Sequence, residues 1–523
     1  MIAALAARIG IARARARTEK LLRELARVDA PAAAASVLVD GVWDNPNHWM
    51  RYSFLRAALG LAGAREIAIT GPYNARRVGR TLRRLGVREV VSLPALADRG
   101  AENRRRALEI LGQTRRADDV LKWQLPHGVP AALVYDGILK RQRLGLVDVA
   151  DRRLAGFVAE ALDCITAAER LLERYQFDLL TVSHPCNFLH VAVLWLALRR
   201  GIPALLLLGG FGTLRLTKLR VPEDVFRYVD VPDALELAAL SSDRRERLEQ
   251  LGQSYLARRL EGQTSDAGAL QAYRGRPLRM DRASIARAFD WDAGKPIVAV
   301  YAPNWFDFPH GTGLVSFRDY QDWIEVTAQA ARANPGVQWL FKRHPWDVRY
   351  AGVSLSDVAP GIETHPHMRL VPDDWNGAAL VEQVDGLVTC QGTSGIEFAA
   401  LGRPVLLAHE GWYDHGGFAL RAGSKEEYVA LLGRAWWTEL SLAETTRRAR
   451  AFAGIYFGHP AWQPPLLFQD DSVQWEIYAR LPELLERGAP ALQREIATIR
   501  EWYASPSRTY HTFKMLTAED YSS

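Results

Sequence analysis

The feature that most constrains the fold is an alternation of short apolar runs with helical patterns, repeated along most of the 523-residue chain. The apolar runs are rich in Val, Ile and Leu, and they end in turn residues, as β-strands do. In the first half the expected strands are ASVLVDG (35–41), EIAITG (66–71), EVVSL (89–93), FDLLTVS (177–183) and IPALLLLGG (202–210). Because helical patterns separate the strands, the order predicts βαβ units and parallel sheets. The clearest unit is FDLLTVS, the helix FLHVAVLWLALRRG and the strand IPALLLLGG.

A second series of strands begins near Gly294, which predicts a second doubly wound domain. Its expected strands are KPIVAVYAP (295–303), VQWLFKRHP (337–345), MRLVP (368–372), GLVTCQ (386–391) and RPVLLAH (403–409). Two domains or more are also expected because 523 residues exceed what one core ordinarily supports. We therefore predict an α/β fold of two doubly wound, Rossmann-like domains that face a cleft, with helical extensions at both ends.

The domain boundaries follow from changes in pattern. A polar helical stretch at about 233–290 reads as a connecting segment, and the chain becomes helical after about residue 425. We predict a basic amphipathic helix at 1–30, an N-terminal α/β domain with the connecting segment at 31–290, a C-terminal α/β domain at 291–450, and helices at 451–523 that pack back across the domains.

Composition excludes several classes of protein. Hydrophobic residues make up 48% and charged residues 24%, as in soluble globular proteins, and neither value suggests disorder. The net charge of +6 is modest, and no basic run interleaved with aromatic residues predicts a nucleic-acid groove. The three cysteines (Cys164, Cys186 and Cys390) lie far apart, which argues against a disulfide framework and for a reducing compartment.

The N-terminus has the pattern of a helix that carries arginines among Ala, Ile and Leu. It has no continuous apolar region before a cleavage site, so we do not expect a secretory signal. The alternatives are a surface helix packed on its own domain and a helix resting on an anionic membrane. The most hydrophobic window, 189–210, is interrupted by Arg199, Arg200 and Gly-Ile-Pro, so no run approaches the ~20 residues that span a bilayer. We expect a cytoplasmic protein, with peripheral contact to the inner membrane as the alternative.

One group of candidate site residues follows the expected strand that ends at Cys390. Gln391, Gly392, Thr393, Ser394 and Gly395 form a turn before a helix. Small residues allow the backbone to approach a ligand, and the first amides of a helix are free to donate to a phosphate. An equally simple interpretation is an N-cap at Thr393 or Ser394 with Glu397 completing a capping box. Glu397 is also placed to accept two ribose hydroxyls.

A second group is the basic corner KRHP at the end of the strand VQWLF. Lys342 offers a mobile charge for phosphate and His344 a hydrogen-bond donor. The carboxyl ends of parallel strands share one edge of a sheet, so we expect this corner and the Gly-Thr-Ser turn to face the same ligand. Arg343 is expected to face away. A solvated turn is the alternative.

Two further strand ends belong to the same expected edge. YAPNWFDFPHG places Asn304, Asp307 and His310 in a glycine-rich loop. LAHEGWYDHGG places His409, Glu410, Asp414 and His415 after another strand, but no helical i, i+4 histidine pair supports a metal site there. We expect no metal and no resident cofactor.

The segments YAPNWFDFPHG…YQDWIEVTAQAARANPGVQWLFKRHPWD and CQGTSGIEFAALGRPVLLAHEGWYDHGGFA resemble the capsular polysaccharide biosynthesis family. That family includes the bacterial Kdo transferases of capsule and lipopolysaccharide assembly, which have GT-B folds. The resemblance covers about 300–430 well and the first half loosely. Its specific part is the order of a strand-end His-Pro, a Gly/Ser/Thr turn with a glutamate, and a Pro-Val strand.

The resemblance implies a glycosyltransferase whose C-terminal domain binds a nucleotide-activated sugar, CMP- or UDP-linked. By position, Lys342, His344, Thr393 and Ser394 would contact the donor phosphate, and Glu397 would hold the ribose. Asn304, Gly392 and Gly395 complete our expected donor-binding set. Kdo transferases of this group usually continue with a Pro-Phe-Tyr-Gly-Trp-Gly type sequence, whereas this chain has EGWYDHGGFA. The donor is therefore not fixed as CMP-Kdo.

For the first half, the resemblance implies a domain that binds a glycan or glycolipid acceptor and supplies a carboxylate as base or nucleophile. The candidates are Asp136 in LVYDGILKR, Asp44 in GVWDNPNHW, and the pair His184 and Asn187 in SHPCNF. Because Tyr135 precedes Asp136 and Gly137 follows it, we expect Asp136 at a strand end or in a loop. Our choice of catalytic residues is Asp136, His344 and Asp307, although an Asx-turn also explains Asp136.

Three other functions fit the same architecture. They are a UDP-sugar epimerase, a polyol-phosphate transferase of the teichoic type, and a non-catalytic partner in polysaccharide assembly or export. Fold alone does not separate them from a glycosyltransferase. The intact set Lys342, His344, Thr393, Ser394 and Glu397 argues against a degenerate, inactive copy.

Overall fold

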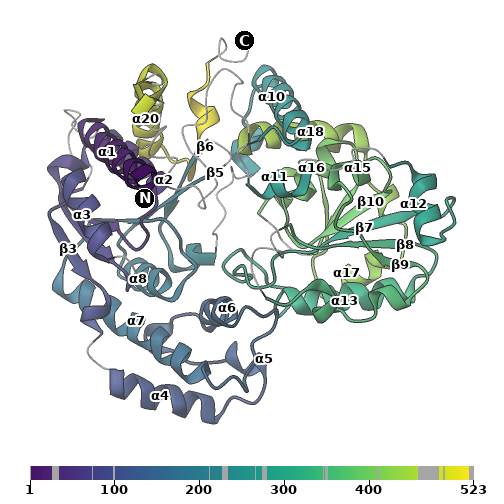
Figure 1. Cartoon of the computed structure of the whole chain (residues 1–523), viewed down its shortest axis with the longest axis horizontal. Helices are drawn as coiled ribbons and strands as arrows, with labels where there is room; N and C mark the ends of the chain where they lie inside the picture. The colour runs from purple at the N-terminus through teal and green to yellow at the C-terminus, as the bar shows by residue number, and fades with distance from the viewer. Residues whose placement is uncertain are drawn as a thin grey trace.

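The computed structural model describes residues 2–25, 34–72, 75–97, 100–210, 213–226, 232, 234–264, 267–273, 280–345, 347, 352–408, 412–457, 482–483, 485–486 and 489–517. Its elements form two α/β domains that lie side by side (Figure 1). Each domain is built on its own sheet, and loops from the C-terminal domain reach helices of the N-terminal one.

The N-terminal domain contains a seven-stranded sheet with the order β13-β6-β5-β4-β1-β2-β3. Its strands are β1 (Ser36–Asp40), β2 (Arg65–Thr70), β3 (Glu89–Ser92), β4 (Leu179–Val182), β5 (Ala204–Gly210), β6 (Thr213–Leu219) and β13 (Thr509–His511). Strands β1 to β5 are parallel, whereas β6 and β13 join antiparallel. The parallel part is a doubly wound sheet whose strand order reverses between β1 and β4.

The helices of this domain cover both faces of the sheet. They are α2 (Pro46–Ala58), α3 (Ala75–Leu85), α4 (Gly100–Gly112), α5 (Ala117–Val120), α6 (Ala131–Gln142), α7 (Leu154–Arg174) and α8 (Phe188–Arg199). Helix α8 is buried along nearly its whole length because it lies between the sheet, α6 and α7. This explains why its sequence is apolar on all sides.

The C-terminal domain contains a six-stranded parallel sheet with the order β12-β11-β10-β7-β8-β9. Its strands are β7 (Ile297–Tyr301), β8 (Gln338–Lys342), β9 (Met368–Leu370), β10 (Gly386–Thr389), β11 (Val405–Leu407) and β12 (Leu420–Arg421). The order reverses between β7 and β10. In such sheets ligands bind outside the carboxyl ends of the strands at the point of reversal.

The helices that follow these strands complete the domain. They are α13 (Tyr320–Ala333), α14 (Leu355–Val358), α15 (Gly377–Val381), α16 (Ser394–Ala400), α17 (Lys425–Leu432) and α18 (Leu442–Tyr456). The connecting segment forms α9 (Ala234–Ala238), α10 (Ser242–Leu260), α11 (Ala267–Tyr273) and α12 (Arg282–Phe289). Helix α10 packs along α18, and Gly252 and Gly454 allow their backbones to come close. A Cβ at Gly252 would lie 2.0 Å from a backbone oxygen of α18, and a Cβ at Gly454 would lie 2.1 Å from a backbone oxygen of α10.

The C-terminal part of the chain returns to the N-terminal domain. Helix α20 (Ala489–Ala504) packs on α2, and β13 pairs with β6 at the edge of the sheet. Buried Glu495 of α20 accepts hydrogen bonds from Thr512 Oγ1 (2.8 Å) and Tyr510 OH (3.3 Å). The helix was predicted, but the strand was not.

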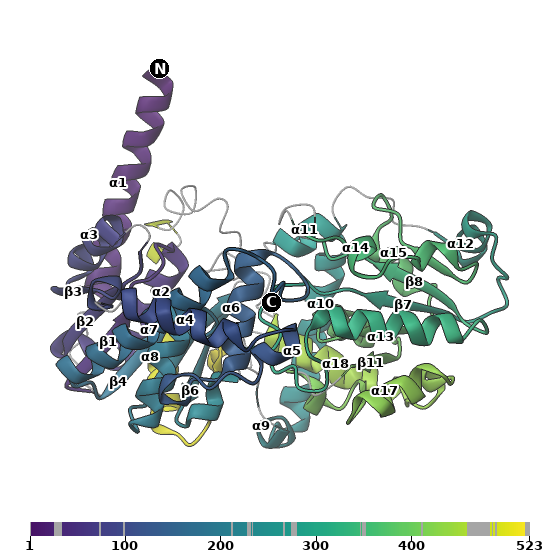
Figure 2. The same cartoon turned by 90° about the horizontal axis from the view of Figure 1, so that it is seen from below.

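Helix α1 (Ile2–Leu25) starts well away from the rest of the molecule (Figure 2). Its second half packs on the N-terminal domain, where Arg15 donates to Asp44 (3.0 Å) and Arg84 donates to Glu19 (2.9 Å). Asp44, a candidate carboxylate, therefore anchors α1. The structure agrees with the packed-helix interpretation for this second half.

The predicted fold class is confirmed as two Rossmann-like α/β domains with helical extensions. Within the residues that the structure describes, no helix combines the length and apolar character needed to cross a bilayer.

Candidate functional site

Each sheet places chemically active residues at its point of strand reversal. In the N-terminal sheet, Asp40 ends β1 and His184 follows β4. In the C-terminal sheet, the loop from Asn304 follows β7 and the turn from Gln391 follows β10. These are the positions at which doubly wound sheets bind ligands.

Asp40 organises the N-terminal edge. Its carboxylate accepts from the Ser183 backbone N (2.8 Å), Ser183 Oγ (2.5 Å), the His190 ring Nε2 (2.9 Å) and the Val42 backbone N (3.0 Å). Burial alone would raise the pKa of Asp40, but His190 and its other partners lower it well below the ordinary value. The sequence analysis missed this residue, although a carboxylate at the end of an apolar strand is a recognisable signal.

His184 lies between the two domains. Its ring packs edge-on against Phe308 of the C-terminal domain, with centroids 5.5 Å apart, and lies 6.5 Å from the His190 ring. Burial, helped by His190, lowers the pKa of His184 to about 4, so the ring is neutral at pH 7. Asn187, proposed with it as a pair, is instead the N-cap of α8 and accepts from the His190 backbone N (3.1 Å).

Asp136 joins the domains from within α6. It is fully buried, and its carboxylate accepts from His310 Nδ1 (2.7 Å) and from the Gly311 backbone N (2.7 Å), both in the loop after β7. The expectation of a strand end or loop at Asp136 is wrong. Gly137, which suggested a turn, is a packing glycine, because a Cβ there would lie 2.1 Å from the Phe188 ring.

The geometry around His310 suits proton transfer. The carboxylate of Asp136 holds Nδ1 as the protonated nitrogen, which leaves Nε2 with a lone pair. Within the described chain Nε2 has no hydrogen-bond partner, and the residue retains 8% exposure. A histidine oriented by a buried carboxylate is a recurring arrangement for a general base.

Two neighbours of Asp136 on α6 also contact the C-terminal domain. Tyr135 OH donates to Asp319 Oδ2 (2.5 Å), and Lys140 Nζ donates to Asp307 Oδ1 (3.0 Å). Asp136 and Lys140 are four residues apart and therefore share one face of the helix. Helix α6 thus positions the whole loop that follows β7.

Asp307 lies where the two edges meet. Its side chain is 60% exposed, and its surroundings include Lys140, His184 and His344. Desolvation raises the pKa of Asp307, but these three cationic or ionisable neighbours outweigh that effect and lower it. Residues predicted as separate candidates in both halves of the chain therefore come together here.

The KRHP corner follows β8 as predicted. Lys342 is the last residue of β8 and is buried at 8% exposure, with Nζ 5.9 Å from the centroid of the Tyr301 ring. His344 is partly buried and interacts electrostatically with Asp307. Arg343, which was expected to face away, pairs with Asp373 (3.3 Å).

The turn after β10 differs from the expected cap. Thr393 precedes α16 without a side-chain capping bond, so the Thr393/Glu397 capping box is wrong. Gly392, Thr393 and Ser394 remain partly exposed, whereas Gly395 is buried. A Cβ at Gly395 would lie 2.0 Å from the Tyr413 hydroxyl, so this glycine makes room for a tyrosine.

Glu397 is buried on α16 with both oxygens occupied. Oε1 accepts from Arg259 Nε (2.7 Å), and Oε2 accepts from Tyr273 OH (2.5 Å). Both partners come from the connecting segment. Tyr273 also lies beside Lys342 and Tyr301 around Gly377, so the residues predicted for one donor border the same buried polar cluster.

The remaining candidates have structural partners or lie outside the described residues. The Asn304 side chain accepts from the Phe306 backbone N (3.4 Å) and shapes its own loop. Asp414 pairs with Arg421 (2.8 Å). His409 and Glu410 are not among the described residues. In the part of the chain that is described, no cluster of three or more His, Cys, Asp or Glu side chains is arranged to hold a metal ion.

Two of the solved structures that match this chain are distant from it in sequence and in structure. UDP-GlcNAc 2-epimerase from Neisseria meningitidis, bound to UDP-GlcNAc, matches at 11% identity over 81% of this chain and 96% of its own, with a TM-score of 0.23. The glycosyltransferase SnogD from Streptomyces nogalater matches at 14% identity over 87% of this chain and 100% of its own, with a TM-score of 0.25. At these scores neither match informs activity.

Comparison by sequence is more specific. No curated protein matches the chain. Residues 317–435 match the family described as capsule polysaccharide biosynthesis protein. That segment includes His344, the turn after β10 and Glu397. The resemblance to the capsule polysaccharide biosynthesis family, predicted from the strand-end motifs, is therefore confirmed over this segment.

Proposed function

We propose that the protein is a glycosyltransferase of the GT-B type that moves a sugar from a nucleotide-activated donor to a surface polysaccharide or a lipid-linked acceptor. The observation that carries the proposal is the junction at which Asp136, His310, His184, Asp307 and His344 meet. It lies where the carboxyl edges of two doubly wound sheets come together. The family match over 317–435 supplies the biological context.

In this proposal His310 Nε2 takes the proton of the acceptor hydroxyl. Asp136 is a positioning residue, because it binds Nδ1 and stabilises the imidazolium that forms when Nε2 is protonated. This revises the sequence-based expectation that Asp136 itself is the base or nucleophile. The Gly311 amide, which also donates to Asp136, holds the carboxylate in place.

The donor is assigned to the C-terminal domain. Lys342 and His344 at the end of β8, with the partly exposed turn Gly392–Ser394, would stabilise the negative charge of the departing nucleotide. A ribose role for Glu397 requires Tyr273 to release one carboxylate oxygen. Because protein cations supply the charge, we expect transfer to persist in EDTA.

The cellular setting follows the same reasoning. A lipid-linked acceptor would place the protein at the cytoplasmic face of the inner membrane, with α1 as the element that extends outward (Figure 2). Deletion of residues 1–28 is expected to lower liposome binding in a sedimentation assay. Unchanged binding would remove α1 from this part of the proposal.

Thermal-shift screening tests the donor class. UDP-, GDP-, CMP- and CDP-sugars are compared at 100 times a trial Kd, where a true ligand stabilises the fold by about 2.7 kcal/mol. The expected result is stabilisation by one nucleotide class, followed by sugar transfer to a glycan or glycolipid that EDTA does not inhibit. Absence of any stabilising nucleotide contradicts the proposal, and release of an epimerised sugar nucleotide without transfer favours the epimerase alternative.

A further inference from the structure

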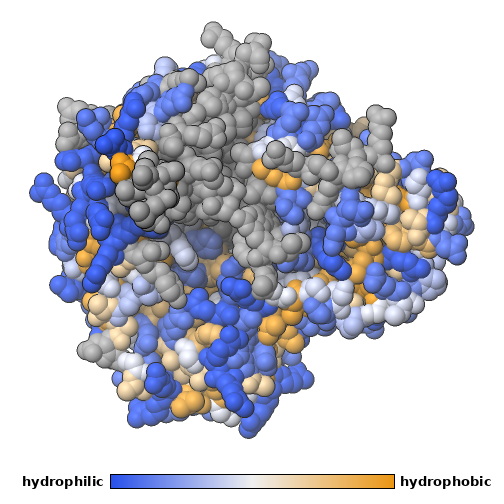
Figure 3. All heavy atoms as spheres, in the orientation of Figure 1, coloured by the Kyte–Doolittle hydropathy of each residue, from blue (hydrophilic) through white to orange (hydrophobic). Residues whose placement is uncertain are grey.

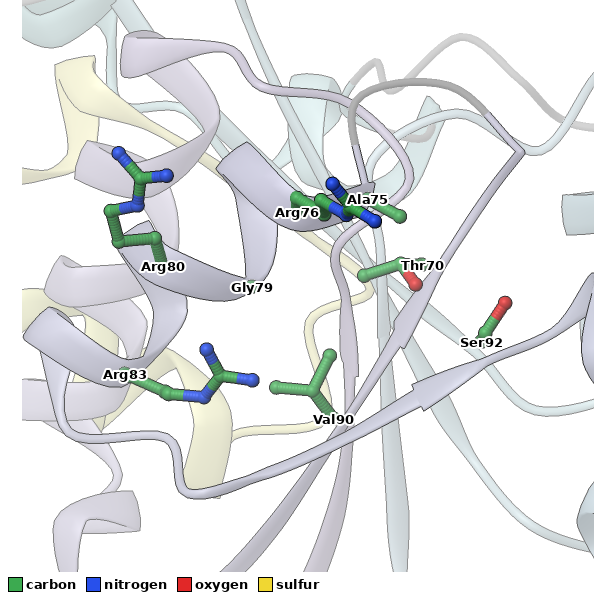
Figure 4. Close-up of a pocket in the computed structure, with 8 residues that line it drawn as sticks. All are labelled: Thr70, Ala75, Arg76, Gly79, Arg80, Arg83, Val90 and Ser92. Carbon is green, nitrogen blue, oxygen red and sulfur yellow. The ribbon is translucent and has the colours of Figure 1, made fainter.

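A groove lies between helix α3 and the outer strands of the N-terminal sheet (Figure 4). Its volume is about 410 Å³, within the range of small-molecule sites. Arg76, Arg80 and Arg83 of α3 line one side, and Val90 of β3 lines the other. None of the residues discussed in the proposed mechanism belongs to it.

The three arginines have no carboxylate partner in the described structure, in contrast to two others on the same helix. Arg77 pairs with Asp44 and Arg84 pairs with Glu19, whereas Arg76, Arg80 and Arg83 make no ion pair with the described residues. Arginines three and four residues apart on a helix repel one another. Repulsion between these arginines therefore slightly destabilises the folded protein, and an anion bound between them would remove that repulsion.

Gly79 gives the groove its depth. It lies in the interior of α3, where glycine costs about 1 kcal/mol relative to alanine. A Cβ at Gly79 would meet only Val90 Cγ1, at 3.8 Å, which is an ordinary contact. Since neither packing nor backbone conformation requires a glycine here, its effect is to leave space between the arginines and the sheet.

The groove begins at the edge of the sheet that carries the proposed reaction site. Thr70 and Ser92, which also line it, are the last residues of β2 and β3. Strand β2 is separated from β4, which leads to His184, by β1 alone. At about 4.8 Å between strands, the mouth of the groove lies roughly 10–15 Å along the edge from His184.

The arginines extend the groove away from that edge. Arg76 and Arg83 are separated by about 10 Å along the helix, at 1.5 Å per residue. In Figure 4 Arg76 lies beside Thr70 and Arg83 extends toward Val90, whereas the end of Arg80 points away from the strands. The exposed surface over this side of the molecule is mainly hydrophilic (Figure 3).

We propose that this groove binds a phosphate-bearing part of the acceptor, with its mouth roughly 10–15 Å along the sheet edge from His184. Guanidinium groups bind phosphate oxygens in pairs, and a span of about 10 Å accommodates a diphosphate or two phosphate groups. The phosphate belongs either to a lipid headgroup or to a soluble phosphorylated glycan. The assignment to the acceptor rests on the proposed function, but the anion site itself does not.

The binding test uses the full-length protein with His344→Ala. This substitution weakens pyrophosphate binding at the proposed donor site of the C-terminal domain, so that the titration reports on the groove. Inorganic pyrophosphate is titrated calorimetrically at low salt. Arg76→Gln/Arg83→Gln is expected to weaken binding about 100-fold, and Arg80→Gln less. The control Arg104→Gln/Arg106→Gln removes the same charge from exposed positions of α4 and is expected to leave binding unchanged.

A second variant tests the shape of the groove. Gly79→Leu fills the floor with a good helix former, so it is expected to weaken pyrophosphate binding without lowering the melting temperature. Pyrophosphate binding that survives both Arg76→Gln/Arg83→Gln and Gly79→Leu, or that falls equally in the α4 control, overturns the proposal.

Vesicles distinguish the two sources of phosphate. If the ligand is a lipid headgroup, Arg76→Gln/Arg83→Gln reduces sedimentation with phosphatidylglycerol vesicles, and phosphatidylcholine vesicles do not bind. If the ligand is soluble, vesicle binding is unchanged while pyrophosphate binding falls. In a chain that keeps His344, stabilisation by the nucleotide sugar should persist in Arg76→Gln/Arg83→Gln, which separates this test from that of the proposed function. Wild-type KM for the acceptor in that variant overturns the assignment to the acceptor.

Discussion

Asp136 and Glu397 are both buried carboxylates that hold together distant parts of the chain, yet their partners differ. Asp136 binds a histidine whose second nitrogen has no hydrogen-bond partner among the described residues, whereas both oxygens of Glu397 are bound, by Arg259 and Tyr273. The first arrangement orients a group that can still exchange a proton. The second fixes the connecting segment on the C-terminal domain. The residue that resembled a ligand-binding glutamate in sequence thus has a structural role in the conformation described.

The largest loss of stability is expected when the Glu397 carboxylate, which binds both Arg259 and Tyr273, is removed. Glu397→Ala leaves Arg259 buried without its counter-charge, which should cost about 3–5 kcal/mol. Urea denaturation followed by far-UV circular dichroism measures the loss. Glu397→Gln, which keeps an acceptor for either partner, should cost less. Equal stability of Glu397→Ala and the wild type would show that the cluster does not hold the connecting segment.

The glycine next to that carboxylate provides the second prediction. Gly395→Ala places a Cβ about 2.0 Å from the Tyr413 hydroxyl and should destabilise the protein by about 1–3 kcal/mol. Gly79→Ala in α3 is the matched control, because it meets no close contact and should stabilise by about 1 kcal/mol. Melting temperatures that shift in the same direction would contradict the distinction between the two glycines.

The junction around Asp136 should respond to pH through His184. Its pKa in the folded protein is about 4, below the ordinary value of 6.5, because burial disfavours the charged ring. Between these values the unfolded chain binds a proton that the folded chain does not, so stability falls as pH decreases from 6.5 toward 4. His184→Gln should therefore remove a loss of folding free energy of about 2–3 kcal/mol that the wild type shows between pH 7.5 and pH 4.5. An unchanged pH dependence in denaturation curves would argue against a buried neutral ring.

The smallest effect is expected at the exposed ion pair beside the junction. Lys140 and Asp307 are 32% and 60% exposed, and such pairs contribute at most about 1 kcal/mol. Lys140→Gln should therefore barely change the melting temperature while raising the pKa of Asp307, measurable by NMR titration. A loss of several degrees would show that this pair, rather than Asp136, holds the loop to α6.

Much of the fold could be predicted because strand–helix alternation is a local signal. The strand ends at Lys342 and Cys390 were placed on one sheet edge by the rule for parallel strands, and the structure agrees. Strand β13 could not be found in this way. It pairs with β6, which lies almost three hundred residues earlier, and its short sequence has no pattern that specifies a partner.

Several residues of the candidate site were predicted individually, but the contacts that join them were not. His184, Asp307 and His344 were identified from their positions after strands, but the bond between Asp136 and His310 joins residues 174 positions apart. Two glycines led to wrong expectations about local structure, and the physical reason is the same for both. Gly137 and Gly395 suggested turns or ligand approach, whereas each removes a Cβ where an aromatic side chain packs against a helix. Sequence alone does not distinguish these uses of glycine.

In the proposed mechanism, Asp136 acts on sugar transfer through His310. With the donor identified by thermal shift, the direct measurement is kcat for His310→Ala, Asp136→Asn and the double variant. We expect each single variant to lose about 10²–10⁴-fold, and the double variant to lose no more than His310→Ala, since the pair acts as a unit. Wild-type kcat in His310→Ala, or losses that multiply in the double variant, would show that Asp136 and His310 do not act as one proton-transfer unit.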